Sequence, residues 1–253
     1  MSAAVGRPAA GRATPVGVAT AEPAGRRFRL YVWQIPVRVT HWVTVLSILV
    51  LSLTGIYIAS PFVVPDGGSF MTSVRFIHVV TAFVFIGSGL VRAYWMFAGN
   101  RFARWTAFVP TTRKRWGELL GQTRWYLFLR PHAPKVLGHN ALAAATYTGI
   151  FLILLLQAMT GLALMGVDGT QPWSALFGWI PDLIGIQTMR LVHHLLMWAL
   201  AAFVIHHVYS ALLVDHVERN GLLGSIFTGY KFVTKGEAME ARDGGEDVAE
   251  DLE

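Results

Sequence analysis

The segment RLVHHLLMWALAAFVIHH, residues 190–207, decides the fold of this chain and poses the first question about its function. It belongs to an apolar run from Leu191 to Val214, and about 20 such residues suffice for a helix to cross a bilayer. Two His-His pairs lie inside this run, 13 residues apart by their first members. Ionisable side chains are costly at such depths, so we expect these histidines to be functional.

Three further runs have the same character and cover residues 39–60, 74–98 and 141–165. Hydrophobic residues make up 54% of the 253-residue chain and charged residues 14%, whereas a soluble domain carries about 25% charge. The sequence therefore predicts an all-α integral membrane protein, a bundle of four transmembrane helices over residues 38–216. Residues 1–37 and 217–253 are predicted to be cytoplasmic tails.

Two histidines of the last span are predicted to lie on the same face of the helix. His193 and His207 are 14 residues apart, which leaves an angular offset of about 40° and an axial separation of about 21 Å. The other pairings between the two doublets diverge by more than about 100°. Only His193 and His207 therefore face one bundle interior at two depths. His194 and His206 are expected at helix–helix or lipid contacts.

The same 14-residue interval occurs on the first two spans. His41 lies 14 residues before Gly55, a position without a side chain that would let a porphyrin approach the backbone. His78 lies 14 residues before Arg92, near the inner surface. Guanidinium groups pair well with carboxylates, so arginines close to the histidines are candidates for haem propionates. They are Arg75 and Arg190 near the outer surface, and Arg92 near the inner one.

Helix direction predicts how the four histidines pair. The first span starts inside, which puts His41 near the inner surface, while His78 and His193 lie near the outer surface and His207 near the inner one. We therefore expect His78 with His193 to bind an outer haem, and His41 with His207 to bind an inner haem. The chain has no cysteine, which excludes covalent attachment through C-x-x-C-H and protein-bound iron–sulfur clusters. Two bis-histidine haem b groups, suited to electron transfer, are the prediction.

Orientation follows from the distribution of basic residues. Arginines precede the first span, and eight Lys or Arg residues fill the segment from 99 to 140, whereas the other two connections have none. The positive-inside rule then predicts cytoplasmic termini and a cytoplasmic central loop. The net charge of +6 is explained by the inner membrane face, and no nucleic-acid partner is expected.

Several segments allow two interpretations. Residues 116–129 are either an amphipathic helix on the inner membrane surface or a solvated loop. His139-Asn140 either marks the entry of the third span or belongs to a quinone pocket. Residues 26–28, Arg-Arg-Phe, hint at a twin-arginine export signal, but the following apolar run is long enough to stay in the membrane. The polar, acidic segment from Lys235 to Glu253 is predicted to be disordered.

Two sets of residues resemble the signatures of the nickel–iron hydrogenase b-type cytochrome subunits. The first is Arg38-Val39-Thr40-His41-Trp42 followed by Thr54-Gly55, and the second comprises Arg190, His193-His194-Leu195, Trp198, Phe203 and His207. Residues 124–129 (RWYLFL) and 138–140 (GHN) also resemble this family. The resemblance covers roughly residues 29–230. The family has a small residue two positions before the third ligand, where this chain has Leu191, which puts local haem packing in doubt.

The resemblance implies a di-haem cytochrome b in the bacterial inner membrane that anchors a hydrogenase, with small and large subunits, at the outer face. Electrons from hydrogen would reach quinone through the haems, and the family ligands fall on His41, His78, His193 and His207. A cytochrome subunit of formate dehydrogenase or thiosulfate reductase is the nearest alternative. An alternative of another class is a haem-free anchor or a transporter whose histidines relay protons, which leaves the 14-residue spacing unexplained.

Overall fold

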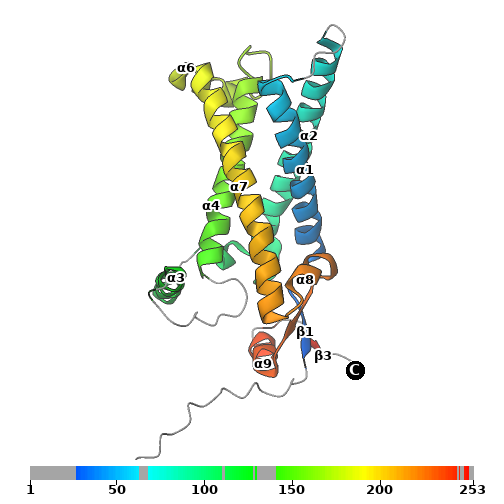
Figure 1. Ribbon diagram of the computed structural model, residues 1–253, viewed down its shortest axis with the longest axis vertical. Helices are drawn as coiled ribbons and strands as arrows, with labels where there is room; N and C mark the ends of the chain where they lie inside the picture. Colours follow the sequence, from blue (N-terminus) through cyan, green and yellow to red (C-terminus); the bar gives the residue numbers. More distant parts are fainter. Residues whose placement is uncertain are drawn as a thin grey trace, which may run out of the picture.

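Four long helices run along one axis in the computed structural model, which describes residues 27–62, 68–109, 112–127, 129, 141–243, 245 and 248–250 (Figure 1). They are α1 (Ile35–Ala59), α2 (Ser69–Ala98), α4 (Ala141–Met165) and α7 (Ile186–Glu218). All four are long and apolar enough to span a membrane, which confirms the predicted bundle. Helix α4 has the predicted bounds, and the other three extend beyond their apolar runs.

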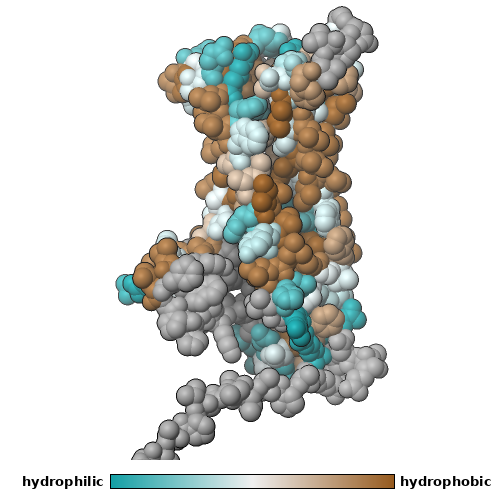
Figure 2. Space-filling model, viewed as in Figure 1, coloured by the Kyte–Doolittle hydropathy of each residue, from teal (hydrophilic) through white to brown (hydrophobic). Residues whose placement is uncertain are grey.

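The surface of the bundle is apolar rather than polar. In each span only 11% of the most hydrophobic window is buried inside the protein. Figure 2 shows hydrophobic side chains along the middle of the molecule and hydrophilic ones gathered toward its two ends. Large side chains such as Phe76 and Ile205 are about 70% exposed, at 68% and 74%. This surface is suited to lipid, and the chain is a multi-pass membrane protein.

The spans form two hairpins, α1 with α2 and α4 with α7, and packing is closest within each hairpin. Small buried side chains allow α1 and α2 to approach, as is usual in membranes. Ser88 donates a hydrogen bond to the Thr40 carbonyl over 3.2 Å, and its hydroxyl lies 3.5 Å from that of Thr44. Among the described helices, no pairing between the hairpins is as close. Side chains, rather than backbone packing, therefore define the space between the hairpins.

A small three-stranded sheet lies at one end of the bundle, beside the start of α1 and the end of α7 (Figure 1). This end is called the inner end, and the opposite end the outer end, after the predicted orientation. Strand β1 (Phe28–Tyr31) lies between β2 (Tyr230–Val233) and β3 (Val248–Glu250), antiparallel to both, with Phe28 opposite Val233 and Glu250. Helices α8 (Leu222–Thr228) and α9 (Lys235–Asp243) flank it. The prediction that the segment from Lys235 is disordered is therefore wrong for the described residues. Leu30 and Val32 pack with Phe102 and Ala241 in a buried cluster, which stabilises α9 and the sheet.

The sheet is joined to the spans by side-chain hydrogen bonds at the start of α1. The Gln34 side-chain oxygen accepts from the indole N–H of Trp95, over 2.8 Å, and from the backbone N–H of Asn100. The Trp33 indole N–H donates to the buried hydroxyl of Ser225 over 3.0 Å. The inner ends of α1 and α2 and the segment after α7 are thereby held in one arrangement.

Shorter helices complete the chain. Residues 105–107 form a single 3₁₀ turn, η2 (Trp105–Ala107), and helix α3 spans Arg113–Tyr126. Helix α3 is seen nearly end-on in Figure 1, so it runs across the bundle axis near the inner end of α4. Its conformation confirms the helix predicted near residues 116–129 and contradicts the loop. Helices α5 (Ser174–Phe177) and α6 (Trp179–Ile184) lie at the outer end.

Candidate functional site

The inner histidine pair brings together the two ends of the chain's membrane region. His41 near the start of α1 and His207 near the end of α7 have ring centroids 6.4 Å apart, with 62° between the ring planes. A metal–imidazole bond is about 2 Å long and the ring centre lies about 1 Å beyond the nitrogen, so two rings on opposite sides of one iron have centroids about 6 Å apart. The observed separation matches ligation of one iron by both rings.

Aromatic side chains surround His207. The ring of Phe203, one turn earlier on α7, stacks on it with centroids 5.4 Å apart and 19° between the planes. Tyr147 of α4 meets it edge-on at 6.1 Å. His41 in turn contacts the ring of Trp42 at 5.4 Å. These neighbours restrict the orientation of both imidazoles.

The outer pair, His78 on α2 and His193 on α7, lies toward the other end of the bundle, close enough for the two imidazoles to interact electrostatically. His78 Nδ1 is 2.8 Å from the hydroxyl oxygen of Thr54 on α1. His193 Nδ1 is likewise 2.8 Å from the hydroxyl oxygen of Thr160 on α4. Each imidazole ring is thus bonded through Nδ1, which leaves its other nitrogen, Nε2, out of the contact with threonine.

Glycines lie directly beside the outer histidines. A Cβ added to Gly55 would be 3.5 Å from Cε1 of His78, and one added to Gly161 would be 3.3 Å from Cε1 of His193. A side chain at either position would fill the space that the histidine ring borders. Gly55 was predicted from its 14-residue distance to His41, and it lies at the depth of the other pair, as helix geometry requires.

The donor set fits a haem iron. Among the described residues there is no group of three or more His, Asp or Glu side chains that would hold a bare metal ion, whereas two pairs of histidines are present. A porphyrin supplies four equatorial nitrogens, so its iron needs only an axial pair. In addition, Oε1 of Gln157, whose amide nitrogen is 3.2 Å from His193 Nε2, is buried without a hydrogen-bond donor among the described residues.

The predicted arginines occupy different environments. Arg75 and Arg190 are exposed near the outer ends of α2 and α7, one helical turn from His78 and His193. Arg92 is half-buried near the inner end of α2, where it donates to the Ala103 carbonyl over 3.3 Å. Its guanidinium also lies over two aromatic rings, those of Phe108 at 5.4 Å and Phe151 at 5.7 Å.

The remaining histidines lie away from these pairs. His206 is exposed, and its ring is 3.4 Å from the hydroxyl of Ser210 on the same helix, as expected for a lipid-facing residue. His194 is half-buried beside His193. The prediction for His139-Asn140 lies outside the described residues, as does Arg26 of the Arg-Arg-Phe segment.

Four residues of the outer and inner sites were not predicted from the sequence: Thr160, Gly161, Gln157 and Tyr147. A signal for two of them is present, because Thr160-Gly161 repeats the dipeptide Thr54-Gly55 on the corresponding helix of the other hairpin. Tyr147 also lies 14 residues before Gly161, as His41 does before Gly55. Nothing in the sequence singles out Gln157.

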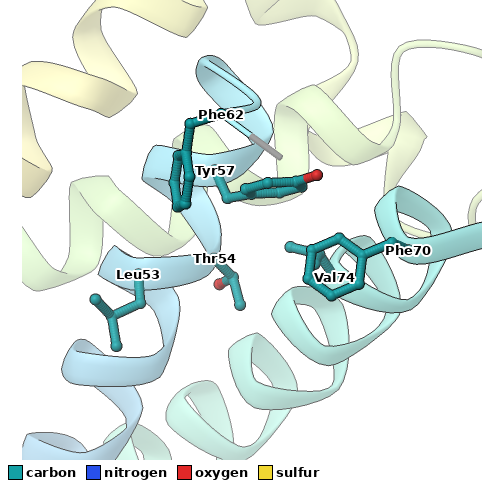
Figure 3. A pocket seen from close by; sticks show the side chains of 6 residues that line it. All are labelled: Leu53, Thr54, Tyr57, Phe62, Phe70 and Val74. Carbon is teal, nitrogen blue, oxygen red and sulfur yellow. The ribbon is translucent and has the colours of Figure 1, made fainter. Parts of the chain in front are cut away.

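A shallow apolar hollow of about 220 Å³ adjoins the outer site. Thr54, Tyr57 and Leu53 of α1 line it together with Phe70 and Val74 of α2 and Phe62 (Figure 3). The Tyr57 ring meets Phe62 and Phe70 edge-on, each at 5.2 Å. These aromatic contacts join the outer ends of the first hairpin on the side of Thr54.

Comparison with known proteins shows the family of the chain. Residues 32–229 match the family model of prokaryotic cytochrome b561, and so define a membrane cytochrome of b type. The chain is 38% identical to a probable Ni/Fe-hydrogenase B-type cytochrome subunit of Cupriavidus necator over 211 residues, 79% of this chain and 86% of the relative. A protein of the same name from Azotobacter vinelandii is 37% identical, with 83% and 91% covered. The probable Ni/Fe-hydrogenase 1 B-type cytochrome subunit of Escherichia coli K12 is 36% identical, with 79% and 90% covered.

The chain therefore belongs to the prokaryotic cytochrome b561 family, in its group of Ni/Fe-hydrogenase b-type cytochrome subunits. A b-type cytochrome carries haem b, which is held without covalent bonds to the protein. The absence of cysteine from the sequence agrees with that mode of binding.

Proposed function

We propose that this chain transfers electrons from a nickel–iron hydrogenase at the outer membrane face to quinone, through two haem b groups. The observation that carries the proposal is the pairing of His41 with His207, whose ring centroids are 6.4 Å apart. His78 and His193 lie toward the other end of the bundle, where their imidazoles interact electrostatically. Two stacked sites in one bundle suit a path for electrons across the membrane. A proton relay or a haem-free anchor has no need of two histidine rings at the separation that His41 and His207 have.

Haem b supplies reversible one-electron chemistry at iron that has no open coordination position when two histidines bind it. The chain supplies the axial nitrogens and the surroundings that orient them. Tight aromatic packing at His207 and hydroxyl bonds at His78 and His193 fix the imidazole planes. Arg75 and Arg190 at the outer site, and Arg92 at the inner site, are proposed to pair with propionates.

The partner is proposed from the relatives, whose names associate them with Ni/Fe hydrogenases. We propose the small and large subunits of such an enzyme, docked at the outer end of the bundle. A formate dehydrogenase or thiosulfate reductase would use the same bundle with another partner. Purification of the intact membrane complex followed by metal analysis separates them, because only a hydrogenase partner brings nickel.

Quinone is proposed to react near the inner pair. If quinone reacted at the outer pair, electrons from an outer partner would not need to reach a second haem. A groove of about 410 Å³ lies beside His41 at the inner end of α1, and its residues are Ile35, Arg38, Val39, Trp42, Val43, Leu46, Ile226 and Phe227. The buried Nε of Arg38 has no acceptor among the described residues. An apolar groove of this size suits a quinone ring.

Haem content provides the direct test of the cofactor. The purified protein is expected to contain two haem groups per chain, because two histidine pairs are present and each iron takes two axial ligands. Acidic organic extraction should remove all of the pigment, as the chain has no cysteine for a thioether bond. A pyridine haemochrome assay before and after extraction measures both quantities. One haem per chain, or pigment that stays on the protein, would contradict the assignment.

The distribution of charge is the basis for the proposed orientation. Residues 38–216 are proposed to be the membrane domain in a bacterial inner membrane, and both termini are proposed to be cytoplasmic. The central segment that carries Arg101 and Arg104 packs at the three-stranded sheet through Phe102, which contacts Leu30 and Val32. Reporter domains fused after residue 253 should be active only if the reporter works in the cytoplasm. A control fusion after Gly169, in the connection between α4 and α5, should give the opposite pattern. A periplasmic signal from the C-terminal fusion would reverse the proposed depths of both haems.

A further inference from the structure

The two hairpins carry the same residues in the same order around the outer site. In α1 and α2 the order is Thr54-Gly55 followed by Arg75-x-x-His78. In α4 and α7 it is Thr160-Gly161 followed by Arg190-x-x-His193. The contacts repeat as well, since each threonine oxygen is 2.8 Å from Nδ1 of the histidine in its own hairpin. The outer site is thus built from two equivalent halves, one from each hairpin.

The inner site does not follow this equivalence. Tyr147 of α4 stands where His41 stands in α1, 14 residues before the glycine, and Arg92 of α2 stands where His207 stands in α7, 14 residues after the histidine. The repeat is therefore complete at the outer pair and broken at the inner one. The threonine–histidine contact occurs in both hairpins at the outer pair, where the two proposed ligands are equivalent. This duplication indicates that the threonines act on His78 and His193.

Hydrogen-bond counting assigns the protons at both contacts. A threonine hydroxyl has one proton, and Thr54 donates it to the Val50 carbonyl over 2.7 Å. Thr160 donates its proton to the Leu156 carbonyl over 2.8 Å. Both oxygens are therefore acceptors toward the histidines, which places the proton of each neutral imidazole on Nδ1. The lone pair of each ring then lies on Nε2, the atom available to iron.

A second contact at His193 agrees with this assignment. The side-chain amide nitrogen of Gln157 lies 3.2 Å from His193 Nε2 and can only donate there. With the Gln157 amide in this orientation Nε2 is the acceptor, as the bond from Nδ1–H to Thr160 requires. Iron bound at Nε2 would take the place of this bond from Gln157. The neighbouring glycine completes the arrangement, because a Cβ at Gly161 would come within 3.3 Å of the same ring.

We infer that Thr54-Gly55 and Thr160-Gly161 are matched clamps that fix the tautomer and ring plane of His78 and His193 and thereby tune the outer haem. This inference rests on the proposed function, in which those histidines bind that haem. A partner that accepts the Nδ1–H proton makes an imidazole more basic, which favours the ferric state and lowers the reduction potential. The glycines keep the ring edge free of side chains. The threonines and glycines are positioning residues and do not touch the iron.

The test uses the intact membrane complex and the variants Thr54→Val, Thr160→Val and both together. Redox titration of the visible bands should show a raised midpoint potential for the outer haem and an unchanged one for the inner haem. Each tenfold change in the ratio of the affinities for ferric and ferrous iron shifts a one-electron potential by about 59 mV. Loss of an outer-shell partner typically weakens metal binding about 10-fold to 100-fold, so the double variant should also retain less outer haem.

Serine replacements and a matched control separate positioning from folding. Thr54→Ser and Thr160→Ser keep the acceptor oxygen and should restore the wild-type potential. Thr146→Val is the control, because Thr146 is an exposed threonine of α4 that bonds back to the Leu142 carbonyl, as Thr160 does to Leu156. Gly161→Ala should change the electron paramagnetic resonance signal of the ferric outer haem, since the added Cβ turns the His193 ring.

The possible outcomes separate a failure of the clamps from a failure of the proposed electron-transfer function. A raised outer potential in the valine variants, with rescue by serine, supports the clamps. Two haems in the wild type and an unchanged outer potential in the double valine variant would overturn the clamps alone. A wild-type protein without an outer haem would overturn both proposals. Equal shifts of both potentials, or the same shift in Thr146→Val, would show a general structural effect and overturn the clamps.

Discussion

Replacement of His78 or His193 by alanine is expected to remove the outer haem and to stop hydrogen from reducing either haem. In the proposed function the outer pair is the entry point for electrons from a partner at the outer face, so its loss should interrupt the path at the first step. Removal of a ligand should cost at least about 100-fold in the rate of hydrogen-driven haem reduction, the upper end of the loss found for residues that only support ligands. Stopped-flow spectroscopy of the complex measures this rate directly.

The matched control for the outer pair is His206→Ala. His206 lies on the same helix as His193 but is exposed, next to Ser210 of its own helix, and its loss should leave both haems in place. Protein levels in the membrane show whether each variant still inserts. If His41→Ala and His78→Ala accumulate normally yet lose the same haem, the assignment of the two pairs is wrong.

Replacement of His41 or His207 by alanine is expected to have the complementary effect. Hydrogen should still reduce one haem at a near-normal rate, because the outer pair is intact, while quinone reduction falls by at least about 100-fold. The ring separation of 6.4 Å suits the proposed binding of one iron by both histidines, so each single variant is expected to lose the whole inner haem. Quinone reduction by hydrogen and the reduced spectrum together give the measurement.

Quinone analogues give an independent check of the inner pair. In the wild type they should perturb the spectrum of the inner haem, since the groove beside Trp42 adjoins His41. In His41→Ala this response should disappear. An analogue that perturbs only the outer haem would place quinone on the opposite side of the membrane from the one proposed.

The spans and the pairing of their histidines were predictable because both follow from short-range rules. Apolar run length predicts a span, and 3.6 residues per turn predicts which histidines share a face. The bounds of α4 match its apolar run, whereas α7 extends to Glu218. With 33 residues it is about 50 Å long, more than the hydrocarbon thickness of about 30 Å, so it continues past the membrane toward the cap.

The cap sheet was missed because nothing within each strand predicts it. Strands β1 and β2 have four residues each and β3 has three, too short for an alternating pattern to stand out. Their stability depends on partners about 200 residues away in the chain and on burial of Leu30 and Val32 against α9. The acidic composition of the last segment pointed to disorder, but a few buried positions such as Ala238 and Ala241 suffice to order α9.

The Thr160-Gly161 contact was missed for a different reason. Threonine and glycine are common in membrane helices, where they assist close packing, so a single dipeptide carries little information. Its meaning becomes visible only when the two hairpins are compared and the same histidine nitrogen is found beside each threonine.

The position of β1 between β2 and β3 has a consequence for biogenesis. β1 emerges from the ribosome before the first span, and its two neighbours emerge after the fourth. The sheet can therefore be completed only after all four spans and residues 248–250 have been translated. Pairings so distant in sequence are slow to form. Closure of the cap is thus a late step that marks a completely translated chain, and a product cut short before β2 would leave β1 without either neighbour.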